Sequence, residues 1–117
     1  MISMAWREMY KSRLVSAEEA VKHIKSGDRV VLGHAVGEPM ELVDAMVENK
    51  DSYKDVEIVH MVAMGKGGYT KPEMESHFRH NALFVGGPTR KAVNESRADY
   101  TPCFFTEIPR LFKEGYL

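Results

Sequence analysis

The sequence has 117 residues, of which 44% are hydrophobic and 28% are charged, and its formal net charge is −1. This length suits one compact domain, and the charge balance gives no electrostatic footprint for nucleic acid or for an anionic membrane surface. No apolar segment approaches the length of a membrane-spanning helix, and the single cysteine, Cys103, cannot form an internal disulfide, which favours a reducing, cytoplasmic setting.

The chain begins with two predicted helices. Residues 3–12 form a short helical pattern that carries an aromatic and apolar stripe. Ser16 is followed three residues later by Glu19, which is a capping-box pattern. It predicts a helix over 17–26, and Gly27 supplies a left-handed stop.

A strand, a helix and a second strand follow. The short apolar run 30–32 lacks alternation, which is typical of a strand covered on both faces. Pro39 tolerates the first position of a helix, so a helix is predicted to begin there. Residues 56–62 are predicted to be a strand. The predicted buried stripe of the helix consists of Leu42, Val43, Met46 and Val47.

The second half continues the same alternation. The apolar run 82–85 predicts a strand, 89–97 a helix, 101–106 a short strand and 108–113 a last helix. Gly115 then indicates a turn into the first residues of another strand. A sheet that stopped there would have an unfinished edge, so we expect the chain to be a piece of a larger protein whose open edge favours association of copies.

Strands that alternate with helices predict an α/β fold with an open, mainly parallel sheet flanked by helices. Ligands bind such sheets at the carboxyl ends of the strands. Those ends are expected at 33–38, 63–68 and 86–90, and all three segments contain glycine. Glycine allows backbone N–H groups to approach a ligand closely.

The glycine-rich segment Gly65–Gly68 resembles a phosphate-binding loop only superficially. It lacks the spacing of a P-loop, and Thr70 stands where a dinucleotide fingerprint requires its third glycine. A mobile turn that closes a βα unit is the simpler interpretation, and a ligand role is the alternative.

The histidines and the cysteine give no complete metal or nucleophile motif. His77 and His80 have a three-residue spacing beside two glutamates, but a solvated polar segment is favoured over a metal site, so no metal is predicted. His60 lies in an apolar strand and is interpreted as a hydrogen-bonded core or interface histidine. Cys103 lacks an evident histidine base. The methionines predicted to fill the core are Met40, Met46, Met61 and Met64.

Three charged residues have two interpretations each. Glu38 is well placed for chemistry at a strand end, and equally for stabilising a helix N-terminus. Glu107 has the same ambiguity. Arg90, in "GPTR", either helps a helix N-terminus bind a carboxylate or phosphate, or is a surface arginine in a sharp turn.

Three segments in order, "SAEEAVKHIKSGDRVVLGHAVGEPMELVDAM", "VEIVHMVAMGKGGYTKPE" and "ADYTPCFFTEIPRLF", resemble the N-terminal part of the acetyl-CoA hydrolase/transferase family. The resemblance implies that 1–117 is a fragment of the N-terminal α/β domain of a two-domain CoA-transferase. The family's nucleophilic glutamate and glycine-rich motif belong to a C-terminal domain that these residues lack. It therefore implies no catalytic residue in this chain, which alone is expected to be inactive.

The resemblance also implies substrates, partners and a cleft. Coenzyme A and acyl-CoA enter as substrates, with no permanently bound cofactor, and the acceptor is a short acid such as 4-hydroxybutyrate, butyrate or acetate. The alternatives are an acetyl-CoA hydrolase and a stand-alone anion-binding α/β module without catalysis. The residues that it places in the cleft wall are His34, Gly37, Glu38, Pro39, Met64, Lys66, Gly67 and Arg90.

Overall fold

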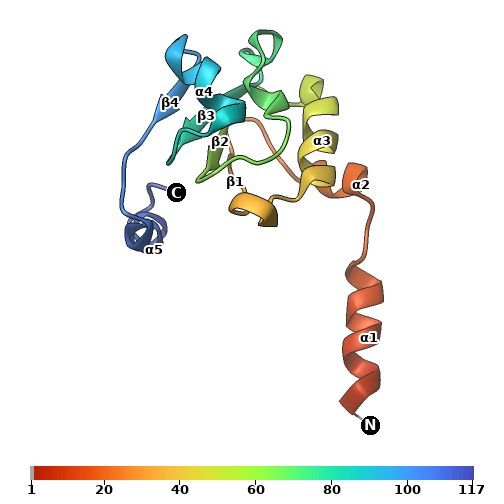
Figure 1. The fold of residues 1–117 in the computed structure, drawn as a ribbon. Helices are drawn as coiled ribbons and strands as arrows, with labels where there is room; N and C mark the ends of the chain where they lie inside the picture. The colour runs from red at the N-terminus through yellow and green to blue at the C-terminus, as the bar shows by residue number, and fades with distance from the viewer. Residues whose placement is uncertain (1) are drawn as a thin grey trace.

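The computed structural model describes residues 2–117 as a four-stranded sheet with helices around it (Figure 1). The strands are β1 (Arg29–Val31), β2 (Val56–His60), β3 (Phe78–Ala82) and β4 (Ala98–Tyr100). They are hydrogen-bonded in the order β1-β2-β3-β4, and each neighbouring pair is parallel. The open, parallel α/β sheet predicted from the sequence is therefore confirmed.

Within residues 2–117, five α-helices accompany the strands. They are α1 (Ile2–Arg13), α2 (Ala17–Val21), α3 (Met40–Glu48), α4 (Gly87–Asn94) and α5 (Ile108–Lys113). The helices α2 and α3 lie side by side, whereas α1 projects away from the sheet (Figure 1). The helices predicted over 3–12 and 108–113 are confirmed, and α3 begins one residue after Pro39.

The helix α2 is shorter than the predicted 17–26. Ser16 caps it as the sequence indicates, because its hydroxyl accepts a hydrogen bond of 3.2 Å from the N–H of Glu19. After Val21 the backbone N–H groups donate to carbonyls three residues back, at 3.2–3.3 Å, so the helix tightens into turns. Gly27 has the predicted left-handed φ, of +84°, but it does not stop the helix, which ends at Val21, and its N–H donates to the Lys54 carbonyl.

Two predicted strands were misplaced. The third strand is Phe78–Ala82 and not 82–85, and the fourth is Ala98–Tyr100 and not 101–106. The continuous apolar run 82–85 resembles a strand, whereas β3 alternates between buried and more exposed residues and its central buried residue is His80. The apolar run after Ala82 instead forms the loop that leads to α4.

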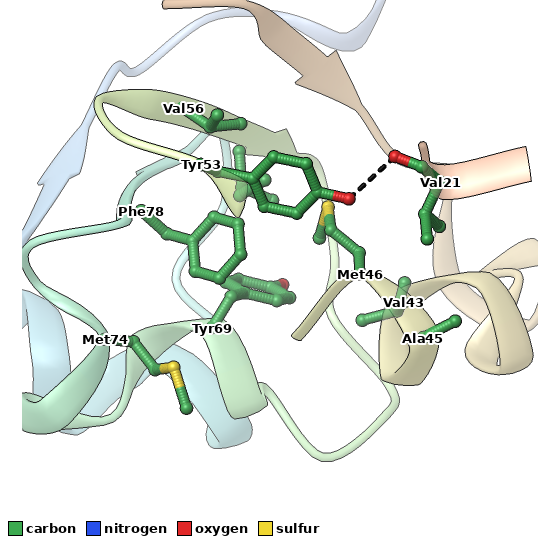
Figure 2. Packing of buried hydrophobic residues seen from close by; sticks show 10 residues of the cluster. Val21, Val43, Ala45, Met46, Tyr53, Val56, Tyr69, Met74 and Phe78 are labelled. Carbon is green, nitrogen blue, oxygen red and sulfur yellow. Dashed lines mark hydrogen bonds between the residues drawn. The ribbon is translucent and has the colours of Figure 1, made fainter. Parts of the chain in front are cut away.

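The hydrophobic core lies between the sheet and the helices α2 and α3. Tyr53, Tyr69 and Phe78 gather beside Met46 (Figure 2). The Tyr53 hydroxyl donates to the Val21 carbonyl at 2.7 Å, which satisfies its only donor inside the core. Leu42 was predicted to belong to the buried stripe of α3, but it is 41% exposed.

The other face of the sheet is polar. Arg29, Glu57 and Arg79 stand beside one another across β1, β2 and β3. Arg29 pairs with Glu57 at 3.2 Å, and Arg79 pairs with Asp99 of β4 at 2.7 Å. Strands covered on both faces were expected, but only β2 has that burial pattern.

The last residues close α5 and do not begin a strand. Gly115 adopts a φ of +77°, and its N–H donates to the Phe112 carbonyl. The N–H of Tyr116 reaches back to the Leu111 carbonyl at 2.9 Å. This pair of bonds is a Schellman motif, which satisfies carbonyls that a helix end leaves free.

Candidate functional site

Three loops meet at the carboxyl edge of the sheet, as parallel strand order requires. The first loop, 33–39, leaves β1, the second, 63–68, leaves β2, and the third, 83–86, leads from β3 into α4. The loops are tied together by one buried carboxylate and by glycines that permit close approach.

Glu38 provides the strongest tie between the first two loops. It is only 5% exposed, and its Oε2 accepts hydrogen bonds from the N–H groups of Met64, at 3.0 Å, and Gly65, at 2.8 Å. Its other oxygen, Oε1, is buried and has no hydrogen-bond partner among residues 2–117. Charge-assisted bonds of this kind are stronger than neutral ones, so Glu38 holds the second loop in place.

Glycine is needed where these loops touch. A Cβ on residue 65 would lie 2.6 Å from Glu38 Oε1, and a Cβ on residue 33 would lie 2.4 Å from the carbonyl oxygen of Gly37. Gly67 has a φ of +59°, and its added Cβ would lie 3.1 Å from the Pro88 carbonyl oxygen. A side chain at residue 65 would push the second loop away from the first, one at residue 67 would push it away from the start of α4, and one at residue 33 would distort the first loop itself.

The first loop also contains backbone strain. Ala35 adopts a φ of +51°, an uncommon conformation for a residue with a side chain. Its N–H donates to the Val62 carbonyl at 3.1 Å, which anchors it to the end of β2. Strain of this kind persists where surrounding contacts hold it, and it is concentrated at functional sites.

A buried histidine and tyrosine lie beneath the first two loops. His60 Nε2 is 2.9 Å from the Gly33 carbonyl oxygen, and His60 Nδ1 is 3.2 Å from the Tyr69 hydroxyl. A carbonyl only accepts, so Nε2 carries the proton and Nδ1 accepts from Tyr69. Burial lowers the pKa of His60 and raises the pKa of the Tyr69 hydroxyl, and both groups are therefore neutral.

The sequence identified His60 as a hydrogen-bonded core histidine, and this interpretation is confirmed. The role of Tyr69 was missed, because it lies in a segment that appeared irregular. Its place three residues after Lys66 in a glycine-rich stretch was the only available signal.

Of the other predicted cleft residues, Gly67 is buried and Pro39 is half-buried, and the rest are exposed around this framework. His34 packs its ring against Phe105 at a centroid distance of 5.4 Å. Lys66 is 78% exposed in its side chain and pairs with Asp44 of α3 at 2.6 Å. Arg90 lies exposed in the first turns of α4. The space enclosed between Glu38, Lys66 and neighbouring glycines is about 10 Å³, roughly room for one water molecule.

Exposed apolar side chains lie along the same edge, one from each loop. Val36 is 87% exposed, and Met64 and Phe84 are each 55% exposed. Met64 and Met40 were predicted to fill the core, but both are exposed, whereas Met46 is buried as predicted. Exposed apolar residues in such a group are typical of a surface that another part of a protein or a ligand covers.

Other candidates take structural roles. His80 is buried in β3 with Nδ1 3.0 Å from the Ile58 carbonyl oxygen, so it belongs to no solvated segment. Within residues 2–117 no group of three His, Cys, Asp or Glu residues could hold a metal ion. Glu107 caps a local turn, since its Oε2 accepts from the Phe104 N–H at 2.7 Å. Cys103 is half-buried.

An apolar groove runs along β1, between α2 and α3. It has a volume of about 220 Å³ and is lined only by apolar side chains of α2, β1 and α3 and their flanking residues. It contains no polar group that could orient a reacting ligand, so the carboxyl edge remains the candidate site.

Comparison with known proteins identifies the family. Residues 2–117 match the acetyl-CoA hydrolase/transferase N-terminal domain. The chain belongs to this family. It is 68% identical over 114 residues to the 4-hydroxybutyrate coenzyme A transferase of Clostridium kluyveri. The match covers 97% of this chain and 27% of that protein. It is 31% identical over 111 residues to the butyryl-CoA:acetate CoA-transferase of Anaerostipes caccae, covering 94% of this chain and 25% of the relative.

Solved structures agree with this membership of the acetyl-CoA hydrolase/transferase family. The 4-hydroxybutyrate CoA-transferase from Porphyromonas gingivalis superposes with a TM-score of 0.70 at 31% identity, covering 96% of this chain and 24% of that one. RipA from Yersinia pestis superposes with a TM-score of 0.79 at 24% identity, over 90% of this chain and 27% of its own, and this likeness shows the fold alone. The chain thus spans about a quarter of the length of its curated relatives. No helix within residues 2–117 combines the length and apolar character needed to cross a membrane.

Proposed function

We propose that this chain is the N-terminal portion of a CoA-transferase that moves coenzyme A between an acyl-CoA and a short carboxylic acid. The observation that carries the proposal is the 68% identity over 97% of the chain to a 4-hydroxybutyrate coenzyme A transferase. Acids of the 4-hydroxybutyrate, butyrate and acetate type are the proposed substrates. Coenzyme A is a substrate in this proposal, no cofactor is bound permanently, and the cytoplasm is the proposed setting.

In the proposed chemistry, the nucleophile is a glutamate of a second domain. Its carboxylate attacks the acyl-CoA thioester, which gives an acyl-glutamyl anhydride and releases the CoA thiolate. The thiolate then attacks the glutamyl carbonyl and frees the donor acid. The acceptor carboxylate attacks the resulting glutamyl thioester, and the thiolate returns to the acyl carbonyl of the new anhydride, which regenerates the glutamate.

This chain supplies one wall of the proposed cleft. The proposal is supported by the meeting of the three loops at the carboxyl edge, where ligands of parallel sheets bind. The exposed polar side chains there, His34, Lys66 and Arg90, are suited to orienting carboxylate or phosphate groups. Buried Glu38 shapes the wall through the second loop and does not attack the thioester. The remaining members of the proposed wall are Gly37, Pro39, Met64 and Gly67.

The test begins with the gene. Reading it past Leu117 should continue the frame into a second domain that bears a glycine-rich segment and a glutamate. A stop codon there would contradict the two-domain proposal and favour a stand-alone binding module. The full-length protein should exchange CoA between acetyl-CoA and members of a panel of short acids.

The same assay separates transfer from hydrolysis. Free CoA that accumulates at the same rate without any acceptor acid would identify a hydrolase. New acyl-CoA that forms only with an added acid would support a transferase. The 117-residue chain should be inactive in both arms.

A further inference from the structure

We propose that His60 and Tyr69 are positioning residues that fix the first loop, 33–39, in the conformation that faces the cleft. This inference rests on the proposed function, because it assigns a role in that same cleft. Neither residue reaches the edge itself, since each is 1% exposed. They act through the Gly33 carbonyl, to which His60 donates.

The loop is held at three points along its length. The Gly33 carbonyl accepts from His60, the Ala35 N–H donates to Val62, and the Glu38 carboxylate accepts from the second loop. The strained φ of Ala35 lies between the two outer anchors. Loss of an outer anchor would let this residue relax toward a more common conformation and carry His34 with it.

Tyr69 supports the bond between His60 and Gly33. The Gly33 carbonyl fixes the proton on Nε2, which leaves a buried lone pair on Nδ1 that the Tyr69 hydroxyl satisfies. Without that hydroxyl, Nδ1 would be buried without a partner, which is costly and lets the imidazole ring rotate away from the carbonyl. The tyrosine therefore holds the ring in the orientation that anchors the loop.

Ordinary core packing does not require this arrangement. His80 is equally buried in the neighbouring strand, and it bonds to the Ile58 carbonyl within the sheet. The His60 bond instead leaves the sheet for a loop that the core does not need. Because a misplacement of about 1 Å in a cleft can cost on the order of 100-fold in rate, such an anchor has a functional consequence.

The chain offers a matched control for Tyr69. Tyr53 is also 1% exposed, and its hydroxyl likewise donates one hydrogen bond, to Val21, far from the carboxyl edge. Tyr69→Phe and Tyr53→Phe each remove one buried hydroxyl. In the full-length protein, Tyr69→Phe should lower kcat for CoA exchange by about tenfold. Tyr53→Phe should leave kcat unchanged even where it lowers the melting temperature as much.

Two substitutions at His60 separate its bonds. Glutamine places an amide nitrogen near the former Nε2, so His60→Gln can still donate to Gly33. Asparagine is shorter and reaches only toward Tyr69. His60→Gln should retain kcat within about threefold, whereas His60→Asn should lose about tenfold or more. If His60 only packed in the core, kcat would not depend on whether the amide side chain is long enough to reach the Gly33 carbonyl.

Hydrogen exchange gives a second measurement that does not depend on activity. The Ala35 N–H should exchange faster in Tyr69→Phe and His60→Asn than in the wild type or Tyr53→Phe. Unchanged exchange and unchanged kcat in folded variants would overturn the inference. If the wild-type protein fails to transfer CoA, the proposed function fails, and the exchange of Ala35 still decides whether these residues position the loop.

Discussion

The carboxylate of Glu38 lies directly against the backbone of Gly65. Its Oε2 is 2.8 Å from the Gly65 nitrogen, and a Cβ on residue 65 would lie 2.6 Å from its Oε1. The Glu38 carboxylate therefore fits in this position only because residue 65 is a glycine. Through this pair, the loops after β1 and β2 form one unit at the carboxyl edge.

Replacing the carboxylate should destabilise the chain. Glu38→Ala removes two charge-assisted hydrogen bonds and leaves two N–H groups without their acceptor. We expect the free energy of unfolding to fall by about 2–3 kcal/mol, measured by urea denaturation. In the full-length protein, kcat for CoA exchange should also fall, because the second loop is no longer held.

A neighbouring glutamate is the control for this substitution. Glu41 lies in the first turn of α3 and is exposed. Glu41→Ala should change the free energy of unfolding by at most about 0.5 kcal/mol, as is usual at surfaces. Equal stability of Glu38→Ala and the wild type would contradict the role of Glu38 as a clamp.

Gly65→Ala should be destabilising only while Glu38 is present. The added Cβ would displace the carboxylate, at a cost of about 1–3 kcal/mol. In the Glu38→Ala background the same change should cost much less, which a double-mutant cycle measures as a coupling energy. Gly87→Ala is the control, because an added Cβ there meets no atom within 4 Å at the start of α4. Additive effects of Gly65→Ala and Glu38→Ala would show that the two residues act independently.

The sequence predicted the parts of the fold in which local signals agree with packing. The cap at Ser16, the left-handed turn at Gly27 and the apolar strand β2 all belong to this class, although the helix ends at Val21, before that turn. The sequence did not predict β3 correctly. Its buried His80 is stabilised by a carbonyl on another strand, and no local pattern reveals that partner.

The candidate site shows the same division. The strand-end rule located the first two loops, because it follows from parallel order alone, but it placed the third at 86–90, whereas the loop after β3 is 83–86. It could not tell that Glu38 is buried and paired with backbone N–H groups 26 and 27 residues later. Nor could it find Tyr69, whose role depends on a contact with His60.

The free energy of unfolding of the chain should decrease as the pH falls below neutral. Burial lowers the pKa of His80 from 6.5 to about 4, so the unfolded chain binds a proton more readily than the folded chain. The folded state is therefore favoured above pH 6.5, and this stabilisation is lost as the pH falls toward 4. The loss between pH 7 and pH 5 should be about 2 kcal/mol from this residue.

Urea denaturation at the two pH values measures this effect, and His80→Gln provides the comparison. The glutamine variant should be less stable at pH 7, but it should lose less additional stability at pH 5. Burial also lowers the pKa of His60, so a smaller dependence of the same sign should persist in the variant. An identical pH dependence in both proteins would contradict the neutral, buried state of His80.

The isolated chain should bind coenzyme A weakly. The enclosed space between Glu38, Lys66 and neighbouring glycines is about 10 Å³, whereas pockets for ligands of this kind measure several hundred Å³. The exposed apolar side chains of Val36, Met64 and Phe84 can cover only one side of a ligand. Calorimetry should therefore give a dissociation constant above about 1 mM for the 117-residue chain and a much lower one for the full-length protein. Micromolar binding by the isolated chain would place the coenzyme pocket entirely within this domain and contradict a cleft formed by two.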